Sequence, residues 1–160
     1  MELWDLYDEN RVPLGRTHPR GEPVPEGTYH LAVIVVILNP RGEVLLTRRA
    51  KEKAVCPGWW ENTGGAALAG ETSLQAILRE LREDRRTDAH FDIYALTWEG
   101  EPEDIRFQAG ETDAARWMPL AEWEAVAGTE GTLCPARGEA YKQELYRRIA
   151  LYLQGQREFS

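Results

Sequence analysis

The stretch Gly65-Ala-Ala-Leu-Ala-Gly-Glu-Thr-Ser-Leu-Gln-Ala-Ile-Leu-Arg-Glu-Leu-Arg-Glu-Asp84 concentrates carboxylates on a segment with helical periodicity. Thr72 is the expected N-cap, and Gln75 completes a capping box three residues later. Apolar residues then recur at helical spacing, at Leu74, Ile77, Leu78 and Leu81. This spacing predicts a helix with one apolar stripe facing a core.

Three carboxylates, Glu80, Glu83 and Asp84, fall together on a second face of the predicted helix. Like charges three or four residues apart destabilise a helix by about 0.2–0.5 kcal/mol per pair. The face therefore needs either solvent and the neighbouring arginines or a bound cation. Thr63-Gly64-Gly65, ahead of the helix, is expected to be a turn whose backbone carbonyls can approach a ligand. Hard divalent cations prefer carbonyl and carboxylate oxygens.

The stretch resembles the Nudix box, G-x5-E-x7-R-E-U-x-E-E-x-G-U, in which U is aliphatic. Both spacings are intact, and the matching residues are Gly65, Glu71, Arg79, Glu80, Leu81 and Glu83. Asp84 replaces the second Glu of the pair, Arg86 replaces Gly, and Thr87 replaces an aliphatic residue. The resemblance implies an α/β Nudix fold, a mixed β-sheet sandwiched between the box helix and a C-terminal helix.

The resemblance also implies a divalent cofactor, Mg²⁺ or Mn²⁺, and a role for each matching residue. Its implied metal ligands are Glu80, Glu83, Asp84 and the carbonyl of Gly65 or Gly64. Arg79 would orient the carboxylates, while Gly64, Gly65 and Glu71 shape the box. Glu111 lies in a G-E-x5-W layout that resembles the segment after the box in many Nudix hydrolases, where the Glu reaches the metal site. The implied catalytic residues are Glu80, Glu83, Glu111 and Arg79.

Three residues outside the box are candidates for substrate contact. Arg48 and Arg49 end a predicted strand that lies near the box in the Nudix fold, so a phosphate contact is expected, with an ion pair to an acidic neighbour as the alternative. Trp60 can stack on a base. Trp59 and Trp60 should point to opposite faces of a strand, and at least one of them is expected in the core.

Length and charge set the broad class. The 160 residues predict a single domain, 1–160, in which 1–28 form an N-terminal hairpin and loop. A net charge of −8 argues against a nucleic-acid polymer as partner. No secretory signal and no membrane-spanning run are visible, so a cytoplasmic protein with free Cys56 and Cys134 is expected.

Alternation and turn residues predict the other elements. The strands are expected at 4–8, 12–17, 29–38, 43–48, 91–98 and 114–118, and further helices at 119–126 and 139–154. Only residues 87–90 separate the box from the strand at 91–98, where Nudix domains ordinarily place a further strand and a loop. Either an edge element has been lost or the sequence omits a segment.

The resemblance implies a metal-dependent hydrolase of a diphosphate linkage in a nucleoside diphosphate joined to another group. Its partner is then a small-molecule nucleotide or other diphosphate, and the oligomeric state, homodimer included, is open. One alternative is a non-catalytic Nudix-fold nucleotide-binding module, because the end of the box is altered. Another is an enzyme like isopentenyl diphosphate isomerase, which the N-terminal segment with Arg16 and His18 resembles. That isomerase uses a cysteine in the segment corresponding to 62–65, where this chain has none.

Overall fold

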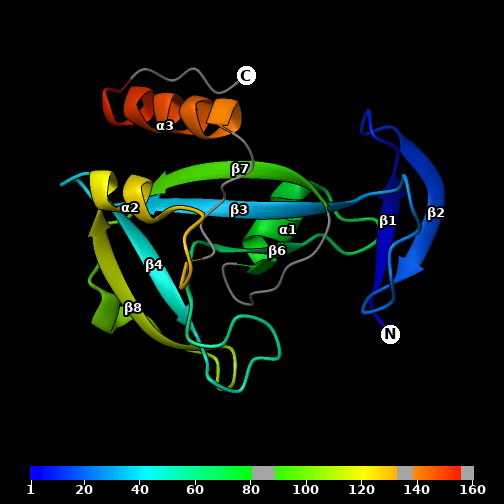
Figure 1. Ribbon diagram of the computed structural model, residues 1–160, viewed down its shortest axis with the longest axis horizontal. Helices are drawn as coiled ribbons and strands as arrows, with labels where there is room; N and C mark the ends of the chain where they lie inside the picture. Colours follow the sequence, from blue (N-terminus) through cyan, green and yellow to red (C-terminus); the bar gives the residue numbers. More distant parts are fainter. Residues whose placement is uncertain (81–88, 133–138, 156–160) are drawn as a thin grey trace. The chain divides into compact units, whose positions relative to one another are not determined.

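The computed structural model describes residues 1–80, 89–132 and 139–155 (Figure 1). The chain forms two compact units. Unit 1 contains Met1–Val35 and Thr63–Tyr94, and unit 2 contains Val36–Asn62 and Ala95–Ser160. The single-domain organisation stays a prediction. In the described part of the chain, no helix is both long and apolar enough to cross a lipid bilayer.

Unit 1 begins with the expected hairpin, β1 (Leu3–Tyr7) and β2 (Pro13–Pro19), which pair antiparallel. The β1 side chain of Trp4 is buried and stacks on the buried ring of His30, with ring centroids 4.1 Å apart. Across the hairpin turn, Arg11 donates two hydrogen bonds, at 2.6 and 2.5 Å, to the carboxylate of Asp92. An aromatic stack and an ion pair thus fix the hairpin to the rest of unit 1.

The central strand β3 (His30–Leu38) is buried along its whole length, as its run of β-branched and apolar residues predicts. β6 (Thr63–Ala66) pairs antiparallel with it, so the expectation of a turn at Thr63-Gly64-Gly65 is wrong. A Cβ on Gly64 would lie 2.3 Å from the carbonyl oxygen of Val33. Glycine is needed here because it lets the two backbones approach closely, and not because a turn is formed.

Helix α1 (Ser73–Glu80) follows β6. The predicted capping box is present: the Thr72 N–H donates to Oε1 of Gln75 at 2.9 Å, and the Gln75 N–H donates to Oγ1 of Thr72 at 3.3 Å. Leu74 is 56% exposed, so the prediction that it belongs to the apolar stripe facing the core is wrong. Ala76 is instead the buried residue of the first turn, because the helix turns this side towards the interior. β7 (Ala89–Thr97) then pairs with β3.

In unit 2, β4 (Glu43–Arg49) pairs antiparallel with β5 (Trp60–Glu61), with β8 (Thr112–Pro119) and, at Val44, with Leu38 at the end of β3. Figure 1 shows β4 in cyan beside β8 in yellow-green. A short 3₁₀ helix, η1 (Pro102–Asp104), lies within the acidic segment 99–104, between β7 and β8.

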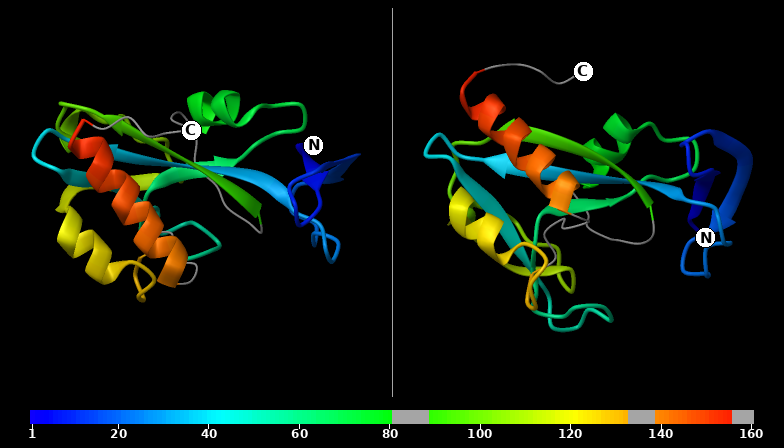
Figure 2. Two further views of the ribbon diagram at one scale, coloured as in Figure 1. Left: turned by 90° about the horizontal axis from the view of Figure 1, so that it is seen from above. Right: turned by 45° about the horizontal axis from the view of Figure 1, so that its top comes forward.

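Two helices complete unit 2, α2 (Leu120–Val126) and α3 (Glu139–Leu153), and both confirm the predicted positions. They lie next to each other (Figure 2). Trp123 of α2 is fully buried and meets the ring of Tyr146 of α3 edge-on, with centroids 5.1 Å apart. Leu145 and Ile149 of α3 are also buried. Each such side chain contributes about 1.5–3 kcal/mol by leaving water, which makes α3 a packing element.

Candidate active site

The box loop connects β6 to α1 within unit 1. Glu71 accepts a hydrogen bond from the Leu68 N–H through Oε2, at 2.8 Å, and its own N–H donates to the Leu68 carbonyl at 2.9 Å. The Gly70 N–H donates to Oδ2 of Asp5 at 2.7 Å. Glu71 therefore closes the turn that leads into α1. This contact gives Glu71 a structural part in the loop.

Arg79 and Glu80 are the last residues of α1, and the structure describes the backbone but not the side chain of each. Glu83 and Asp84 lie outside the described residues, as do Arg86 and Thr87. Within the described residues, no group of three His, Cys, Asp or Glu side chains could hold a metal ion. The metal ligands assigned to this helix therefore stay predictions, as does the shortened gap after the box.

Gly64 and Gly65 are both buried in β6, opposite Ile34 and Val33. Their backbone precedes the box loop directly, so the strand sets the position of the carbonyl that was expected to contribute a metal ligand. The ligation itself stays a prediction.

Glu111 belongs to unit 2 and forms an ion pair with Lys53. Both side chains are largely buried, with 16% and 13% of their surface exposed. The Glu111 carbonyl also accepts a hydrogen bond from the Ala50 N–H at 2.9 Å. These contacts join the loop after β4 to the loop before β8. The metal and catalytic role of Glu111 stays a prediction.

Arg49 lies in the interior of unit 2, where it forms the ion pair that was the alternative to a phosphate contact. Its Nη1 donates to both carboxylate oxygens of Glu61, at 3.1 and 3.0 Å, and its Nε donates to the Val55 carbonyl at 2.9 Å. Three of its N–H···O contacts are thus made within the protein.

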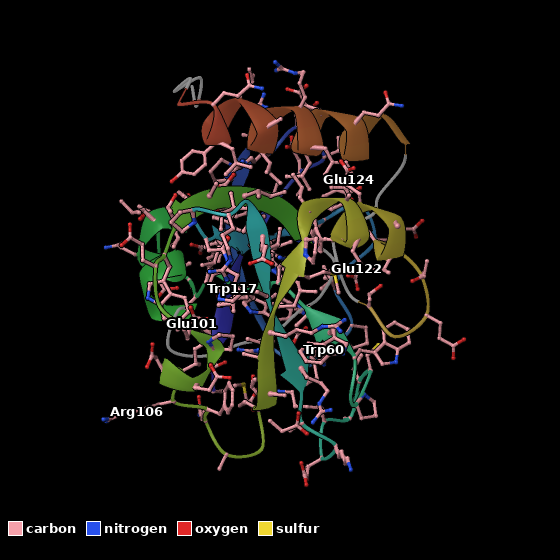
Figure 3. The ribbon with its side chains drawn as sticks, turned by 90° about the vertical axis from the view of Figure 1, so that its left-hand side faces the viewer. Trp60, Glu101, Arg106, Trp117, Glu122 and Glu124 are labelled. Carbon is pink, nitrogen blue, oxygen red and sulfur yellow. The ribbon has the colours of Figure 1, made fainter. Side chains whose placement is uncertain are left out.

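Trp60, labelled in Figure 3, is half-buried, and the Arg48 side chain beside it is 38% exposed. Arg48 donates through Nε to Oδ1 of Asp113 at 2.7 Å, and its guanidinium carbon lies 5.7 Å from the centroid of the Trp60 ring. The guanidinium carbon of Arg116 lies closer, 4.3 Å from the same centroid. Sequence reasoning missed Arg116, because only the β4–β8 register brings it to this ring.

Both Trp59 and Trp60 are half-buried, so the expectation that one of them lies in the core is wrong. The reason is the shortness of β5, which has two residues and pairs with β4 only at Thr47 and Arg48. Cys56 is a free thiol in the loop before these tryptophans, and Cys134 lies outside the described residues.

A second residue that the sequence did not single out is Asn62, which directly precedes β6. Its side chain is 4% exposed, and neither Nδ2 nor Oδ1 has a hydrogen-bond partner in the described part of the chain. Buried amides are normally hydrogen-bonded, so Asn62 departs from the usual pattern within that part of the chain.

The family model for the NUDIX domain matches residues 28–135. An uncharacterized Nudix hydrolase of Listeria monocytogenes is 36% identical over 143 residues, which cover 79% of this chain and 85% of that protein. An isopentenyl-diphosphate Delta-isomerase of Paenarthrobacter aurescens is 37% identical over 90 residues, 56% of this chain and 49% of that protein. The crystal structure of DR0079 from Deinococcus radiodurans superposes with a TM-score of 0.69 at 22% identity, covering 92% of this chain and 99% of that one.

Proposed function

The chain belongs to the Nudix family, and we propose that it is a metal-dependent hydrolase that cleaves a diphosphate linkage in a nucleoside diphosphate joined to another group. The α/β Nudix fold expected from the sequence is confirmed. Similarity to a Nudix hydrolase supports a pyrophosphohydrolase in general terms. The linkage and the nucleotide belong to the proposal.

The observation that carries the proposal is the connection from β6 to α1. Glu71 closes the turn after the buried glycines, and the capping box starts the helix at Ser73. Arg79 and Glu80 consequently fall in the last turn of the described helix, at the spacing of the Nudix box. Because an α-helix places residues three and four apart on one face, a helix that continued would present Glu80, Glu83 and Asp84 together.

The donor set fits a hard divalent ion, because it consists of carboxylate oxygens and the backbone carbonyl of a buried glycine strand. We propose that Glu80, Glu83 and Asp84, with the Gly65 or Gly64 carbonyl, would hold Mg²⁺ or Mn²⁺. The chemistry supplied by such an ion is neutralisation of phosphate charge and a lower pKa for a coordinated water.

The chain's own residues would then position the reaction. Arg79 would orient the neighbouring carboxylates, and a carboxylate of Glu80, Glu83 or Glu111 would accept the proton from the attacking water. Arg48 and Trp60 would contact the substrate, with the guanidinium donating to phosphate oxygens. Hydrolysis of a diphosphate needs little covalent participation by the protein, so positioning and charge stabilisation supply most of the rate.

A phosphate-release screen tests the proposal. The purified chain is incubated with nucleoside di- and triphosphates, sugar nucleotides and dinucleoside polyphosphates in Mg²⁺, in Mn²⁺ and in excess chelator. Release from at least one substrate is expected with metal, and none in chelator. Full turnover in chelator, with residual metal excluded by elemental analysis, contradicts the mechanism.

A non-catalytic binding module and an isomerase would each give a different result from a hydrolase in these experiments. A binding module would show calorimetric nucleotide binding with no release from any substrate in the panel. The isomerase relative motivates the other arm, in which isopentenyl diphosphate is incubated with the chain in deuterated water. No deuterium incorporation is expected, because residues 62–65 contain no cysteine. The same preparations, measured by sedimentation at several concentrations, distinguish monomer from homodimer.

A further inference from the structure

Three side chains on one face of unit 2 form a group that we call the Arg48–Trp60–Arg116 cluster. In the sheet, Arg48 is opposite Trp60 of β5, and Leu46 is opposite Arg116 of β8. Residues opposite each other share a face, and so do residues two apart in one strand, such as Leu46 and Arg48. The register therefore places all three side chains on the same face, in agreement with their distances to the indole ring.

Within the described residues, most of the N–H donors of the two guanidinium groups have no acceptor. Arg48 uses Nε for Asp113, while no hydrogen bond of its Nη groups is found within the described residues. Arg116 is exposed and has neither an ion pair nor a hydrogen bond in that part of the chain. Contact with the indole restricts the orientation of both groups, so less freedom is lost when they bind a ligand.

The charge of the cluster is unusual for this chain, which carries a net charge of −8. Two guanidinium groups against one ring repel each other, and Asp113 neutralises only one of the two positive charges. If only one arginine lay against the ring, a cation–π contact with Trp60 would be enough to explain its position. The second adds a positive charge that has no acidic partner among the residues that the structure describes, and a bound anion would offset it.

We propose that the Arg48–Trp60–Arg116 cluster binds a phosphoryl group, with the Nη groups of Arg48 and the guanidinium of Arg116 donating to its oxygens. A carboxylate has two coplanar oxygens, which one guanidinium fork already matches. A phosphoryl group spreads three oxygens in three directions and can accept from two forks at once. The group can belong to the diphosphate substrate or to a free phosphate. As a part of the substrate contact, the site rests on the proposed function.

Binding is measured without turnover. Inorganic phosphate is titrated into the ¹⁵N-labelled chain in chelator, and the indole N–H resonance of Trp60, assigned by its loss in Trp60→Phe, is followed by NMR. A saturable shift of this resonance is expected. Arg116→Gln should weaken phosphate binding about tenfold or more, the scale of one lost charge-assisted hydrogen bond. Arg48→Gln should weaken it as well, and Arg116→Lys should weaken it less than Arg116→Gln because it keeps the charge but not the fork.

Arg41→Gln is the matched control, because Arg41 is an exposed arginine of unit 2 that pairs with Glu43 and has no ring contact with Trp60. It should bind phosphate like the wild type, and circular dichroism should show all variants folded. Acetate should bind more weakly than phosphate. A nucleoside monophosphate that binds more tightly than inorganic phosphate would assign the group to a nucleotide, and equal affinities would assign it to free phosphate.

Two results overturn the inference: no saturable shift in the wild type, or undiminished phosphate affinity in folded Arg116→Gln. Failure of the hydrolase proposal gives a different pattern. In that case the release screen is negative, while this titration, made in chelator with a ligand that is not cleaved, still reports binding at Trp60.

Discussion

Arg49 and Glu61 form an ion pair in the interior of unit 2, with their side chains only 6% and 1% exposed. Removing one partner takes this ion pair away from the other partner's buried charge, so Glu61→Leu or Arg49→Met alone should cost about 3–5 kcal/mol of unfolding free energy. The double variant should cost less than the sum, because no charge remains buried. Urea unfolding of the four proteins measures the coupling. Additive losses would mean that the pair contributes through packing only.

The approach of β6 to β3 supports a second prediction. Gly64→Ala would place a Cβ 2.3 Å from the Val33 carbonyl oxygen, a backbone atom that cannot rotate away. A loss of about 3 kcal/mol is expected, the upper part of the range for overpacking. Gly70→Ala is the comparison, since that site has a φ of +80° but open space, and should cost about 1 kcal/mol. If thermal unfolding showed the same loss of unfolding free energy in both variants, β6 would be able to move away from β3 without a further cost in stability.

These elements also show what the sequence could predict. The strands of the central sheet followed from runs of β-branched residues, and the start of α1 followed from the Thr72–Gln75 pair, because both signals are local. Thr63-Gly64-Gly65 was misjudged for a non-local reason. Glycine is a weak strand former by itself, and only pairing with β3 makes it one.

The residues of the candidate site also differ in whether a local pattern or a non-local contact identifies them. The box spacing singles out Gly65 and Glu71 as candidates because a fixed pattern lies within one segment of the chain. Arg116 could not be found, since its place beside Trp60 depends on the register between two strands far apart in the chain. Asn62 was missed because a buried amide that has no partner within the described part of the chain is a property of packing, which no local pattern encodes.

The exposed ion pairs of α3 predict a lowered pKa for the carboxyl group of Glu144. Hydrogen bonds from Arg147, and then from Arg148, lower the pKa of Glu144 from 4.5 to about 2. A lowered folded-state pKa stabilises the fold above the unfolded value, and that contribution is lost as pH falls from about 4.5 to about 2. NMR titration of the Glu144 carboxyl should show the shift, and Arg147→Gln combined with Arg148→Gln should return the pKa towards its ordinary value. An unchanged pKa in that variant would exclude the arginines as its cause.

The proposed metal site predicts the effect of Glu83→Gln. Loss of one carboxylate there should lower kcat by about a hundredfold or more, the scale for one electrostatic contact in such a site. Activity of the wild type should rise towards alkaline pH, because the attacking water must lose a proton. Steady-state kinetics on a substrate found in the screen measures both. Glu122→Gln, an exposed acid on α2, should leave kcat unchanged. An unchanged kcat in Glu83→Gln would mean that the metal site lies elsewhere and does not include Glu83.

The buried amide of Asn62 supports the last prediction, in which stability and activity change in opposite directions. Neither the donor nor the acceptor of this amide has a partner among the described residues, and each loses its hydrogen bonds to water on folding. Asn62→Leu removes that penalty at similar volume, so the unfolding free energy should rise by about 1 kcal/mol. Residues that lower stability in this way are often retained for function. Since Asn62 directly precedes β6 and the box, hydrolysis should fall in the same variant.

Asn39 provides the matched control, because it is also a buried asparagine of unit 2 but its amide is paired. Its Nδ2 donates to Oε2 of Glu43 at 2.7 Å, and its Oδ1 accepts from the Glu43 N–H at 3.0 Å. Asn39→Leu should therefore lower the unfolding free energy, by about 1–3 kcal/mol, the opposite sign to Asn62→Leu. If Asn62→Leu is destabilising as well, then Asn62 has a polar partner in solution, such as a buried water, and its amide is a structural group. If it is stabilising and fully active, the amide serves neither packing nor the reaction.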